Sequence, residues 1–434
     1  MGEKKILLVG GTGATEDMIP LAHRNHLSIG VTDYNRDTYI KRIADAAYEV
    51  SVTDEEAVAQ LCRNEGYSGV ISAYSDFLSP YVARIAERIG AYVPFDEEQL
   101  RLSTDKRFFK KKCQEYGVLV PKEYVFQPEE EVGGEEISYP VIVKPIDGSG
   151  SRGITVCRSK EELLQAYAVA QNYSKSGKAI VEQFIEGDEI NVTYIAQDGD
   201  IQVAAIHDRY FNTEQNSTVK VPDLYIYPSR YVDLFLEKYD GPIVRMLRGM
   251  GIRNGSLFLQ ACVQKDQIYL YEAGMRLNGC KTYQILEVEN DYNTQEHLLQ
   301  YALTGSMGKR VQFNPRFKHW YATFNVIGRP GECAERFEGM EELKSYPWLI
   351  AIGRLYHEGE RIPENSKGTL VQVTTRIHIW ADTKEQLMER IAKVNELYRI
   401  FNEKGENILL APHDLEDIRN SLNYELNWQE ESVL

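Results

Sequence analysis

A lysine at the end of an apolar stretch precedes a run rich in glycine and serine. Residues 144–153 read Lys-Pro-Ile-Asp-Gly-Ser-Gly-Ser-Arg-Gly. A loop of this kind can fold over phosphate groups and donate backbone N–H groups to them, with Lys144 as a positive charge beside it. No Gly-Lys-Ser/Thr closes the run, so it is not a P-loop. Taken alone, the run is explained equally well by a hairpin tip with a solvated lysine.

Two side chains that carry oxygen ligands lie further along the sequence. Gln260 and Glu272 occupy two apolar stretches that are separated by a turn centred on Asp266. If these stretches form an antiparallel hairpin about Asp266, the two side chains face each other across it. With phosphate oxygens, such side chains form a magnesium site. The structural alternative is an ion pair between Glu272 and Arg276, four residues on.

A third pattern combines an apolar stretch with an acidic turn. Ile180-Val181-Glu182 leads into Gln183 and Phe184, and Glu189 opens the next apolar stretch. The backbone groups of Gln183 and Phe184 could pair with the edge of a base, and Glu189 could accept from ribose hydroxyls. An exposed acidic turn is the alternative reading of this stretch.

A glycine-rich turn also follows the first apolar stretch of the chain, at residues 10–14, and Asp33 lies about twenty residues further on. This is only part of a dinucleotide-binding fingerprint, because the third glycine position is Glu16. We therefore favour a structural turn or a site for a carboxylate substrate over NAD binding.

The elements that must position these residues fall into three parts. The first 95 or so residues alternate strand and helix patterns, which is typical of a doubly wound α/β unit. Residues 96–117 are helical in pattern, and a β-rich α+β part follows. From about residue 313 the chain has strands and a charged helix of its own, and its tail after Asp414 is weakly patterned. The predicted middle strands are 139–144, 154–157, 179–182, 190–197, 201–207, 257–263 and 268–272, with helices at 160–174 and 231–251.

Composition excludes several classes of function. The 434 residues carry a net charge of −16, which argues against nucleic acid or an anionic membrane surface as a partner. No stretch is apolar enough for a membrane span or a signal peptide. The six cysteines are scattered without a Cys-x-x-Cys pair, which favours a reducing, cytoplasmic location over a disulfide framework or a zinc site.

In their order and spacing, these motifs resemble those of the ATP-grasp superfamily, in the branch of biotin carboxylase, carbamoyl-phosphate synthetase, glycinamide ribonucleotide synthetase and L-amino-acid ligases. The similarity covers residues 1–310 and continues more faintly beyond. It implies a mixed α/β and α+β fold with three parts. These are a Rossmann-like pre-ATP-grasp domain (1–95), a nucleotide-binding ATP-grasp domain (96–310, with a lid subdomain at about 122–185) and a C-terminal lid-like subdomain (311–434).

The resemblance also implies roles for individual residues. In Thr104-Asp105-Lys106, Lys106 would contact the α-phosphate side of ATP, and Lys144 would be the second phosphate lysine. Arg276 would steady the γ-phosphate and the acyl phosphate. The implied lid residues are Gly148, Ser149, Gly150, Ser151 and Gly153, the implied adenine and ribose contacts are Glu182, Gln183, Phe184 and Glu189, and the implied ligands of Mg²⁺ (or Mn²⁺) are Gln260 and Glu272.

One position departs from the family pattern. The usual Glu-x-Asn-x-Arg appears here as Glu272-Ala273-Gly274-Met275-Arg276, so the asparagine that helps to bind a second metal is Gly274. A water molecule or Asn278 would have to take its place, and the number of metal ions is left open.

The resemblance implies an ATP-dependent ligase that joins a small carboxylate and a small amine through an acyl phosphate, with a homodimer as the family-level expectation. On the substrate side, Arg209 is the candidate anion binder, His207 the candidate for direct chemistry, and Lys281 a further candidate. The tyrosine-rich segment 223–229 could line the acceptor pocket or form a packed loop. The alternatives are a ligase that acts on bicarbonate, formate or a ribonucleotide amine, and an ATP-binding regulatory protein that has lost catalysis.

Overall fold

The computed structural model describes residues 4–11, 15–128, 136–147, 153–211, 221–426 and 428. Its N-terminal part is a parallel sheet in the order β3-β2-β1-β4, as the alternating pattern predicted. The strands are β1 (Lys4–Val9), β2 (Leu27–Thr32), β3 (Ala46–Tyr48) and β4 (Gly69–Ile71), and the helices are α1 (Met18–Arg24), α2 (Tyr39–Ile43), α3 (Glu55–Glu65) and α4 (Ser79–Ile89). The side chain of Asp54 caps helix α3, and α4 ends at Gly90, which is in the left-handed conformation.

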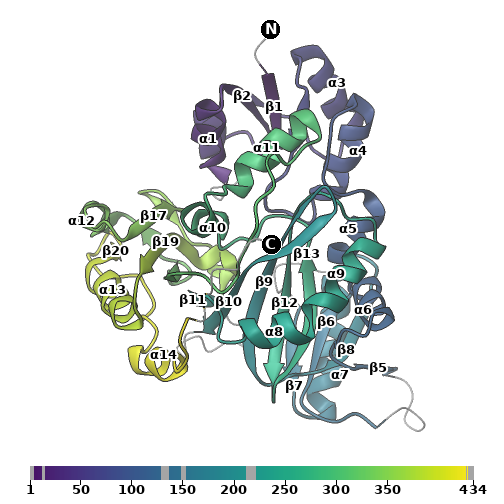
Figure 1. The fold of residues 1–434 in the computed structure, drawn as a ribbon, viewed down its shortest axis with the longest axis vertical. Helices are drawn as coiled ribbons and strands as arrows, with labels where there is room; N and C mark the ends of the chain where they lie inside the picture. The colour runs from purple at the N-terminus through teal and green to yellow at the C-terminus, as the bar shows by residue number, and fades with distance from the viewer. Residues whose placement is uncertain are drawn as a thin grey trace.

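A helix from much later in the chain completes this N-terminal part. Helix α11 (Thr294–Thr304) packs on β1 and β4, and Figure 1 shows it lying across the N-terminal sheet. Its Leu298 and Leu299 share one core with Ile6 and Leu8 of β1 and Met18 of α1. The sequence pattern did not reveal this contact, because it links residues about 290 positions apart.

A small antiparallel sheet, in the order β5-β8-β6-β7, follows helices α5 (Glu97–Thr104) and α6 (Lys106–Glu115). Helix α7 (Lys160–Tyr173) packs against three of its strands, and its apolar residues share their core. The strands are β5 (Glu123–Tyr124), β6 (Val141–Pro145), β7 (Thr155–Cys157) and β8 (Ala179–Gln183).

The largest element is one eight-stranded antiparallel sheet in the order β13-β12-β9-β10-β11-β14-β19-β17. It runs across the predicted domain limit at 310/311, since β11 (Pro222–Tyr227) pairs with β14 (Trp320–Ile327). Within segment 223–229, residues 223–227 thus form a strand, and the chain bends at Pro228 directly after it. The other strands are β9 (Asp188–Gln197), β10 (Asp200–Phe211), β12 (Gly255–Gln264), β13 (Gln267–Gly274), β17 (Leu349–Arg354) and β19 (Val373–Ala381).

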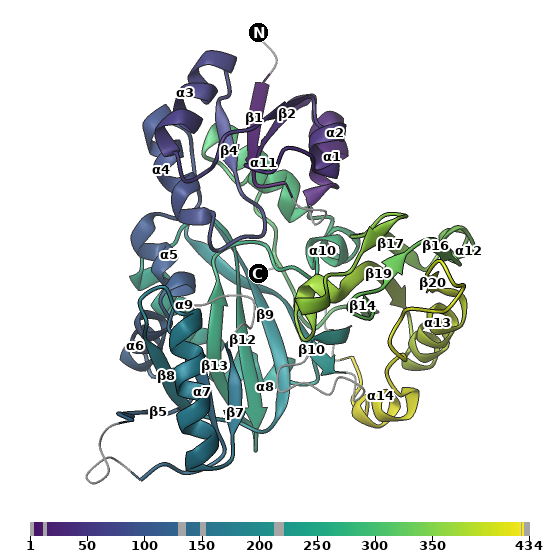
Figure 2. The same ribbon diagram turned by 180° about the vertical axis from the view of Figure 1, so that it is seen from behind.

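The two faces of the large sheet differ in chemistry. Apolar residues of one face pack with helices α8 (Val232–Lys238) and α9 (Asp240–Gly249) near β9 and β12, and with α13 (Lys384–Leu397) near β14 and β19. The opposite face, called the polar face below, carries Glu189, Asn191, His207, Arg209 and Gln260 along neighbouring strands. Figure 2 shows the sheet with the N-terminal part above it.

The remaining elements are short and lie mainly in the C-terminal part. They are α10 (Tyr283–Asn290), β15 (Cys333–Ala334), β16 (Arg336–Glu338), α12 (Met340–Lys344), β18 (Glu360–Arg361), η2 (Glu364–Ser366), η3 (Leu370–Gln372), β20 (Arg399–Phe401) and α14 (Leu415–Ser421). Helix α14 lies in the tail whose sequence pattern looked weak. Among the described helices, none has the length and apolar character to cross a bilayer.

Candidate active site

Two lysines and one glutamate from three elements meet between α6 and the small sheet. Lys144 Nζ on β6 lies 3.2 Å from Glu182 Oε2 on β8, and Lys110 on α6 forms an ion pair with the other carboxylate oxygen. All three side chains are buried, and Glu182 has no exposed surface. Because two cations share one carboxylate, the group carries a net positive charge that attracts an anion.

Helix α6 begins at the Thr-Asp-Lys motif. The Asp105 side chain accepts a hydrogen bond from the Phe108 N–H at 3.0 Å and so caps the helix. Lys106 is therefore in the first turn, and Lys110 follows one turn later on the same helix face. Lys110 was not among the predicted site residues. Its spacing of four from Lys106 is the signal in the sequence that could have found it.

The charges of this group are coupled to the hairpin that was predicted to hold metal. Burial is the largest effect on Lys106 and Lys110, and it lowers the pKa of both. The negative charge of Glu272 partly offsets this at Lys106, and that of Glu182 does so at Lys110. Burial alone would raise the pKa of Glu182, but Lys144 and Lys110 outweigh it and lower this pKa. Glu182 is thus ionised and keeps two lysines in place.

The predicted lid residues Gly148, Ser149, Gly150 and Ser151 lie outside the described residues. The residues on either side are anchored to the end of α7. Asp147 accepts from Ser174 Oγ at 2.7 Å and from the Ser176 N–H at 2.9 Å. Gly153 has a φ of +71°, and a Cβ there would lie 2.8 Å from Tyr173 Cβ, so only glycine fits.

Strands β12 and β13 form the predicted hairpin, and Gln260 pairs directly with Glu272. The turn is tighter than predicted, because Lys265 and Asp266 alone form it, both with positive φ. A bulge next to Gln260 leaves Tyr271 as an extra residue and restores the predicted pairing. Glu272 is exposed and Gln260 half-buried on the polar face.

Gly274 pairs with Phe258 across the same hairpin, and the ring fills the space beside it. A Cβ at Gly274 would lie 2.2 Å from two ring carbons of Phe258. A side chain at 274 therefore has no room. Asn278, the other candidate for a second metal ligand, is buried, and its amide bonds Thr193 Oγ1 and both the hydroxyl and the N–H of Thr282.

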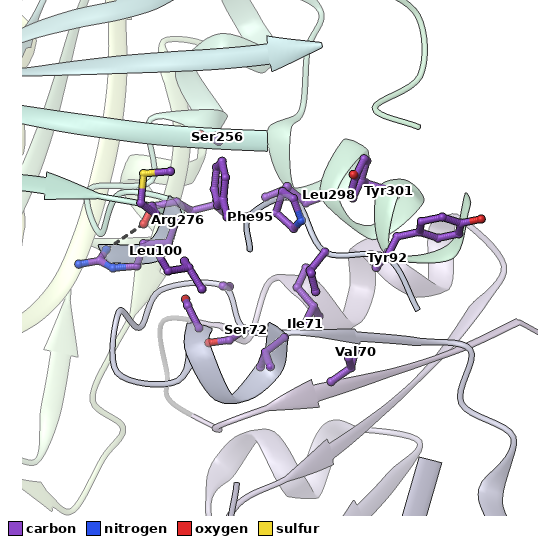
Figure 3. Close-up of a pocket in the computed structure, with 18 residues that line it drawn as sticks. Val70, Ile71, Ser72, Tyr92, Phe95, Leu100, Ser256, Arg276, Leu298 and Tyr301 are labelled. Atoms are coloured by element: carbon purple, nitrogen blue, oxygen red, sulfur yellow. Dashed lines mark hydrogen bonds between the residues drawn. The ribbon is translucent and has the colours of Figure 1, made fainter. Parts of the chain in front are cut away.

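Arg276 links the hairpin to the N-terminal part. Its Nε donates to Asp76 Oδ2 at 2.6 Å, and its guanidinium lies over the Phe258 ring. The ion pair predicted as an alternative, with Glu272, is thus replaced by one with Asp76. Figure 3 shows Arg276 at a cavity between β4, α11 and β12. The cavity measures about 60 Å³, which is too small for a nucleotide.

Glu189, predicted to contact ribose, and Arg209, predicted to bind a substrate anion, contact each other. Arg209 Nη1 lies 2.5 Å from Glu189 Oε2, and the Tyr271 hydroxyl donates to the same oxygen at 2.8 Å. The bulge at Tyr271 places this hydroxyl beside Glu189. As the structure stands, Arg209 is neutralised by Glu189, so the geometry favours Arg209 as a residue that orients Glu189.

The backbone N–H groups of the predicted adenine contacts are already bonded. Gln183 N–H donates to the Lys122 carbonyl at 2.8 Å, and Phe184 N–H to the Pro140 carbonyl at 3.1 Å. In this conformation a base would have to use other groups of this segment, such as carbonyl oxygens.

His207 lies in the polar face but is fully buried. Its Nε2 is 3.9 Å from Cys280 Sγ, and its ring packs between Tyr225 and Tyr227. Burial holds its pKa well below the usual range, so the ring is neutral. The neighbouring Asp208 points to the other face, where it bonds Ser229 and Arg230.

The first glycine-rich turn is supported by Asp33, whose Oδ2 accepts from the Gly11 N–H at 3.1 Å. This contact favours a structural role for Asp33 over a ribose contact. Residues 12–14 lie outside the described residues. Lys281, the further substrate-side candidate, forms an ion pair with Asp17 at 2.9 Å.

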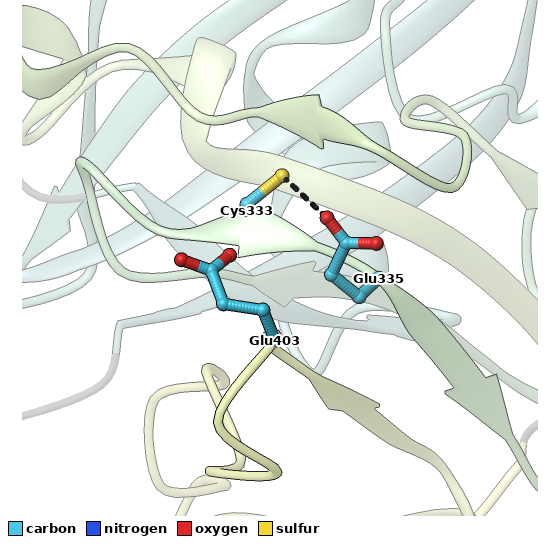
Figure 4. A group of neighbouring side chains, drawn as sticks. All are labelled: Cys333, Glu335 and Glu403. Carbon is cyan, nitrogen blue, oxygen red and sulfur yellow. Dashed lines mark hydrogen bonds between the residues drawn. The ribbon is translucent and has the colours of Figure 1, made fainter.

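A separate group of possible metal ligands lies in the C-terminal part. Figure 4 shows Cys333, Glu335 and Glu403 side by side, with Cys333 Sγ 3.2 Å from Glu335 Oε1. Both glutamates are exposed, and none of these residues belongs to the elements described above as the site. Exposed acidic groups of this kind are common without a metal ion.

Comparison with known proteins gives a family match for the middle of the chain. Residues 137–284 match the family model of the ATP-grasp domain. The chain contains an ATP-grasp domain. The 2-oxoglutarate carboxylase small subunit of Hydrogenobacter thermophilus is 24% identical, over 84% of this chain and 79% of that protein.

Two solved structures share the ATP-grasp fold. The L-amino acid ligase from Bacillus licheniformis has a TM-score of 0.74 at 16% identity, with 93% of this chain and 100% of the ligase covered. The biotin carboxylase domain of H. thermophilus 2-oxoglutarate carboxylase, solved with MgADP and bicarbonate, has a TM-score of 0.73 at 17% identity, covering 93% of this chain and 91% of the domain. The resemblance and the fold class predicted from sequence are therefore confirmed.

The relatives and solved structures that match include a carboxylase subunit and an L-amino acid ligase, both named as enzymes. The matched segment contains Lys144, Glu182, Glu189, Gln260 and Glu272, while Lys106 and Lys110 precede it. The relatives differ in their substrates, so the substrate has to be argued from this chain's own residues.

Proposed function

We propose that this ATP-grasp protein is a carboxylate–amine ligase for small molecules of amino-acid type. It would form an acyl phosphate from ATP and a carboxylate, then an amide, and release ADP and phosphate. The observation that carries this proposal is the buried group of Lys110, Lys144 and Glu182 with Lys106 close by, next to the Gln260–Glu272 pair. Such a group binds and neutralises a polyphosphate.

The lysines bind the phosphates from one side. Lys106 and Lys144 keep the roles that the motifs implied, and Lys110 adds a charge one helical turn from Lys106. Glu189 would accept from the ribose hydroxyls, with Arg209 and Tyr271 holding its carboxylate in place. Glu182 would act mainly by fixing the lysines, because both of its oxygens are occupied by them.

The residues present fit one divalent cation. Gln260 and Glu272 offer oxygen ligands on the same face, and Glu272 is an exposed carboxylate in an otherwise apolar strand. Bound Mg²⁺ or Mn²⁺ would neutralise charge on the β- and γ-phosphates. Position 274 adds no ligand, since Phe258 fills its space.

The chain contributes charge and alignment to the chemistry. A substrate carboxylate attacks the γ-phosphorus, the bond to the β-phosphate oxygen breaks, and ADP leaves. An amine then attacks the acyl carbon, loses a proton and displaces phosphate. Arg276 would steady the transferred phosphoryl group, and Asp76 fixes the direction of its guanidinium. A closed lid would exclude water, which hydrolyses acyl phosphates.

A carboxylase that activates bicarbonate is the second candidate, since a 2-oxoglutarate carboxylase subunit covers most of the chain.

Phosphate release tests the proposal. The protein is incubated with Mg-ATP and the twenty L-amino acids, singly and in pairs, with bicarbonate as a separate arm. We expect release that depends on amino acids and that falls at least about a hundredfold in Lys144→Met, with unchanged turnover in Lys160→Met, an exposed lysine on α7. Release with bicarbonate alone would favour the carboxylase, and tight ATP binding without any release would favour a regulatory protein.

A further inference from the structure

Strand β19 places a second basic group on the polar face of the large sheet, away from the phosphate lysines. Arg376 pairs with Asn325 of β14, and His378 pairs with Thr323, whose own partner on β11 is Tyr225. Arg376 and His378 are two residues apart, so their side chains leave the same face of the strand.

Within the described part of the chain, Arg376 is a buried cation without a carboxylate partner. Only 5% of its surface is exposed. Its Nε donates to Asn325 Oδ1 at 3.2 Å, whereas its Nη1 is buried without a hydrogen-bond partner in the described part of the chain. Among those residues, no carboxylate lies within 4.0 Å of the guanidinium. A buried charge without a partner is energetically unfavourable, so it needs a counter-ion.

Among the same residues, His378 also has a ring nitrogen without a hydrogen-bond partner. Its Nδ1 lies 2.9 Å from the Thr323 hydroxyl, while its Nε2 is buried with no partner among the described residues. The ring is neutral, because burial and the charges of Lys281 and Arg376 keep its pKa well below the usual range. With the hydroxyl donating to Nδ1, Nε2 carries the proton and is a donor.

The loop that follows Arg276 leaves room for an added Cβ at Gly279 beside the guanidinium. A Cβ built on Gly279 would lie 4.0 Å from Arg376 Nη2, with no other heavy atom closer. Three residues of chain span at most about 10 Å, so Gly279 and Arg276 stay within reach of one small molecule. Lys281 holds this loop against Asp17 of the N-terminal part.

We propose that Arg376 and His378 bind the carboxylate of the amine-donating substrate, which makes that substrate an amino acid or a short peptide with a free carboxyl group. The carboxylate accepts two N–H bonds from the guanidinium and one from His378, and it supplies the missing counter-ion. The inference rests on the ligase function proposed above, and it assigns the acceptor side of the same site.

The first test supplies one fixed carboxylate donor and compares each amino acid as the free acid and as the carboxamide in the acceptor role, with the amide product formed on that donor as the readout. In the unmodified protein the acids should act as acceptors at least about tenfold better than the amides. In Arg376→Met this preference should vanish through a higher KM for the acid, with the KM for ATP unchanged. Arg419→Met, an exposed arginine on α14, is the matched control.

A second variant tests the subsite in case Arg376→Met does not fold. Gly279→Leu keeps the guanidinium but fills the space in front of it, so it should also raise the KM for the acid while retaining the melting temperature. Equal use of acids and amides by the unmodified protein would overturn the subsite even if ligation is observed.

Binding without turnover separates the subsite from the proposed function. Acetate is titrated calorimetrically into the protein saturated with magnesium and a non-hydrolysable ATP analogue, which covers the phosphate lysines. We expect acetate binding that weakens about tenfold or more in Arg376→Met. If acetate binding is lost in Arg376→Met, and the unmodified protein releases no phosphate with any substrate, the subsite is retained and the ligase function is rejected. No acetate binding in the unmodified protein would reject the subsite.

Discussion

Single charges decide how this protein would hold a nucleotide. Lys110 and Lys144 share the carboxylate of Glu182, so removal of either lysine leaves a buried acid with only one partner. The sequence identified Lys144 and Lys106 through their motifs. It did not identify Lys110, because a lysine in a run of basic residues on a helix normally faces water. The spacing of four from Lys106 placed Lys110 on the same helix face, and the fold shows that this face is buried there.

The neighbouring Lys111 provides a test of Lys110 on the same helix. Lys110 is 4% exposed, whereas Lys111 is exposed. Lys110→Met should weaken binding of Mg-ATP at least about tenfold, because it removes a positive charge from a desolvated site. Lys111→Met should leave binding unchanged, as measured by isothermal titration calorimetry. Equal effects of the two variants would place Lys110 outside the nucleotide site.

At the scale of elements, the sequence predicted the β12–β13 hairpin. It did not predict the two-residue turn or the bulge at Tyr271. The symmetric placement of Gln260 and Glu272 about Asp266 predicted their pairing, because register in a hairpin is set by its turn. The bulge at Tyr271 could not be predicted, since it depends on the contact of Tyr271 with Glu189 on another strand. Contacts between distant elements, such as Arg276 with Asp76, also leave no local pattern.

Because Phe258 packs against Gly274, we can predict how the stability of the hairpin changes when position 274 carries the asparagine of the family motif. Gly274→Asn alone should lower the free energy of unfolding by about 2 kcal/mol, because its Cβ overlaps the Phe258 ring. In combination with Phe258→Ala, which opens the space, the added cost of the asparagine should fall below about 1 kcal/mol. Urea unfolding of the four proteins of this cycle gives both values. Additive costs would mean that the ring does not exclude the side chain.

At the scale of the whole molecule, the large sheet joins parts that the sequence separated. Strand β11 has β14 as its neighbour, and Tyr225 and Tyr227 share a core with Phe313, Phe317 and Tyr321. The motifs predicted the order of the parts. They could not show this shared sheet, because the pairing of β11 with β14 follows from tertiary packing.

A chain that ends at residue 310 tests this continuity. It leaves β11 as a free edge strand and exposes the apolar residues of its core, so it should aggregate. A chain that ends at residue 426 retains both strands and should stay soluble. Size-exclusion chromatography of the two proteins after identical expression gives the comparison. A soluble, monomeric 1–310 fragment would show that the two parts fold separately.

The packing of α11 on the N-terminal sheet has a consequence for biosynthesis. The first four strands leave the ribosome early, yet Leu298 and Leu299, which complete one face of their core, are made some two hundred residues after β4. Domains generally fold as units during synthesis. The N-terminal part therefore exposes the apolar surface that α11 later covers until most of the ATP-grasp domain has been synthesised. During translation, therefore, the first part of this chain to be made is among the last to be finished.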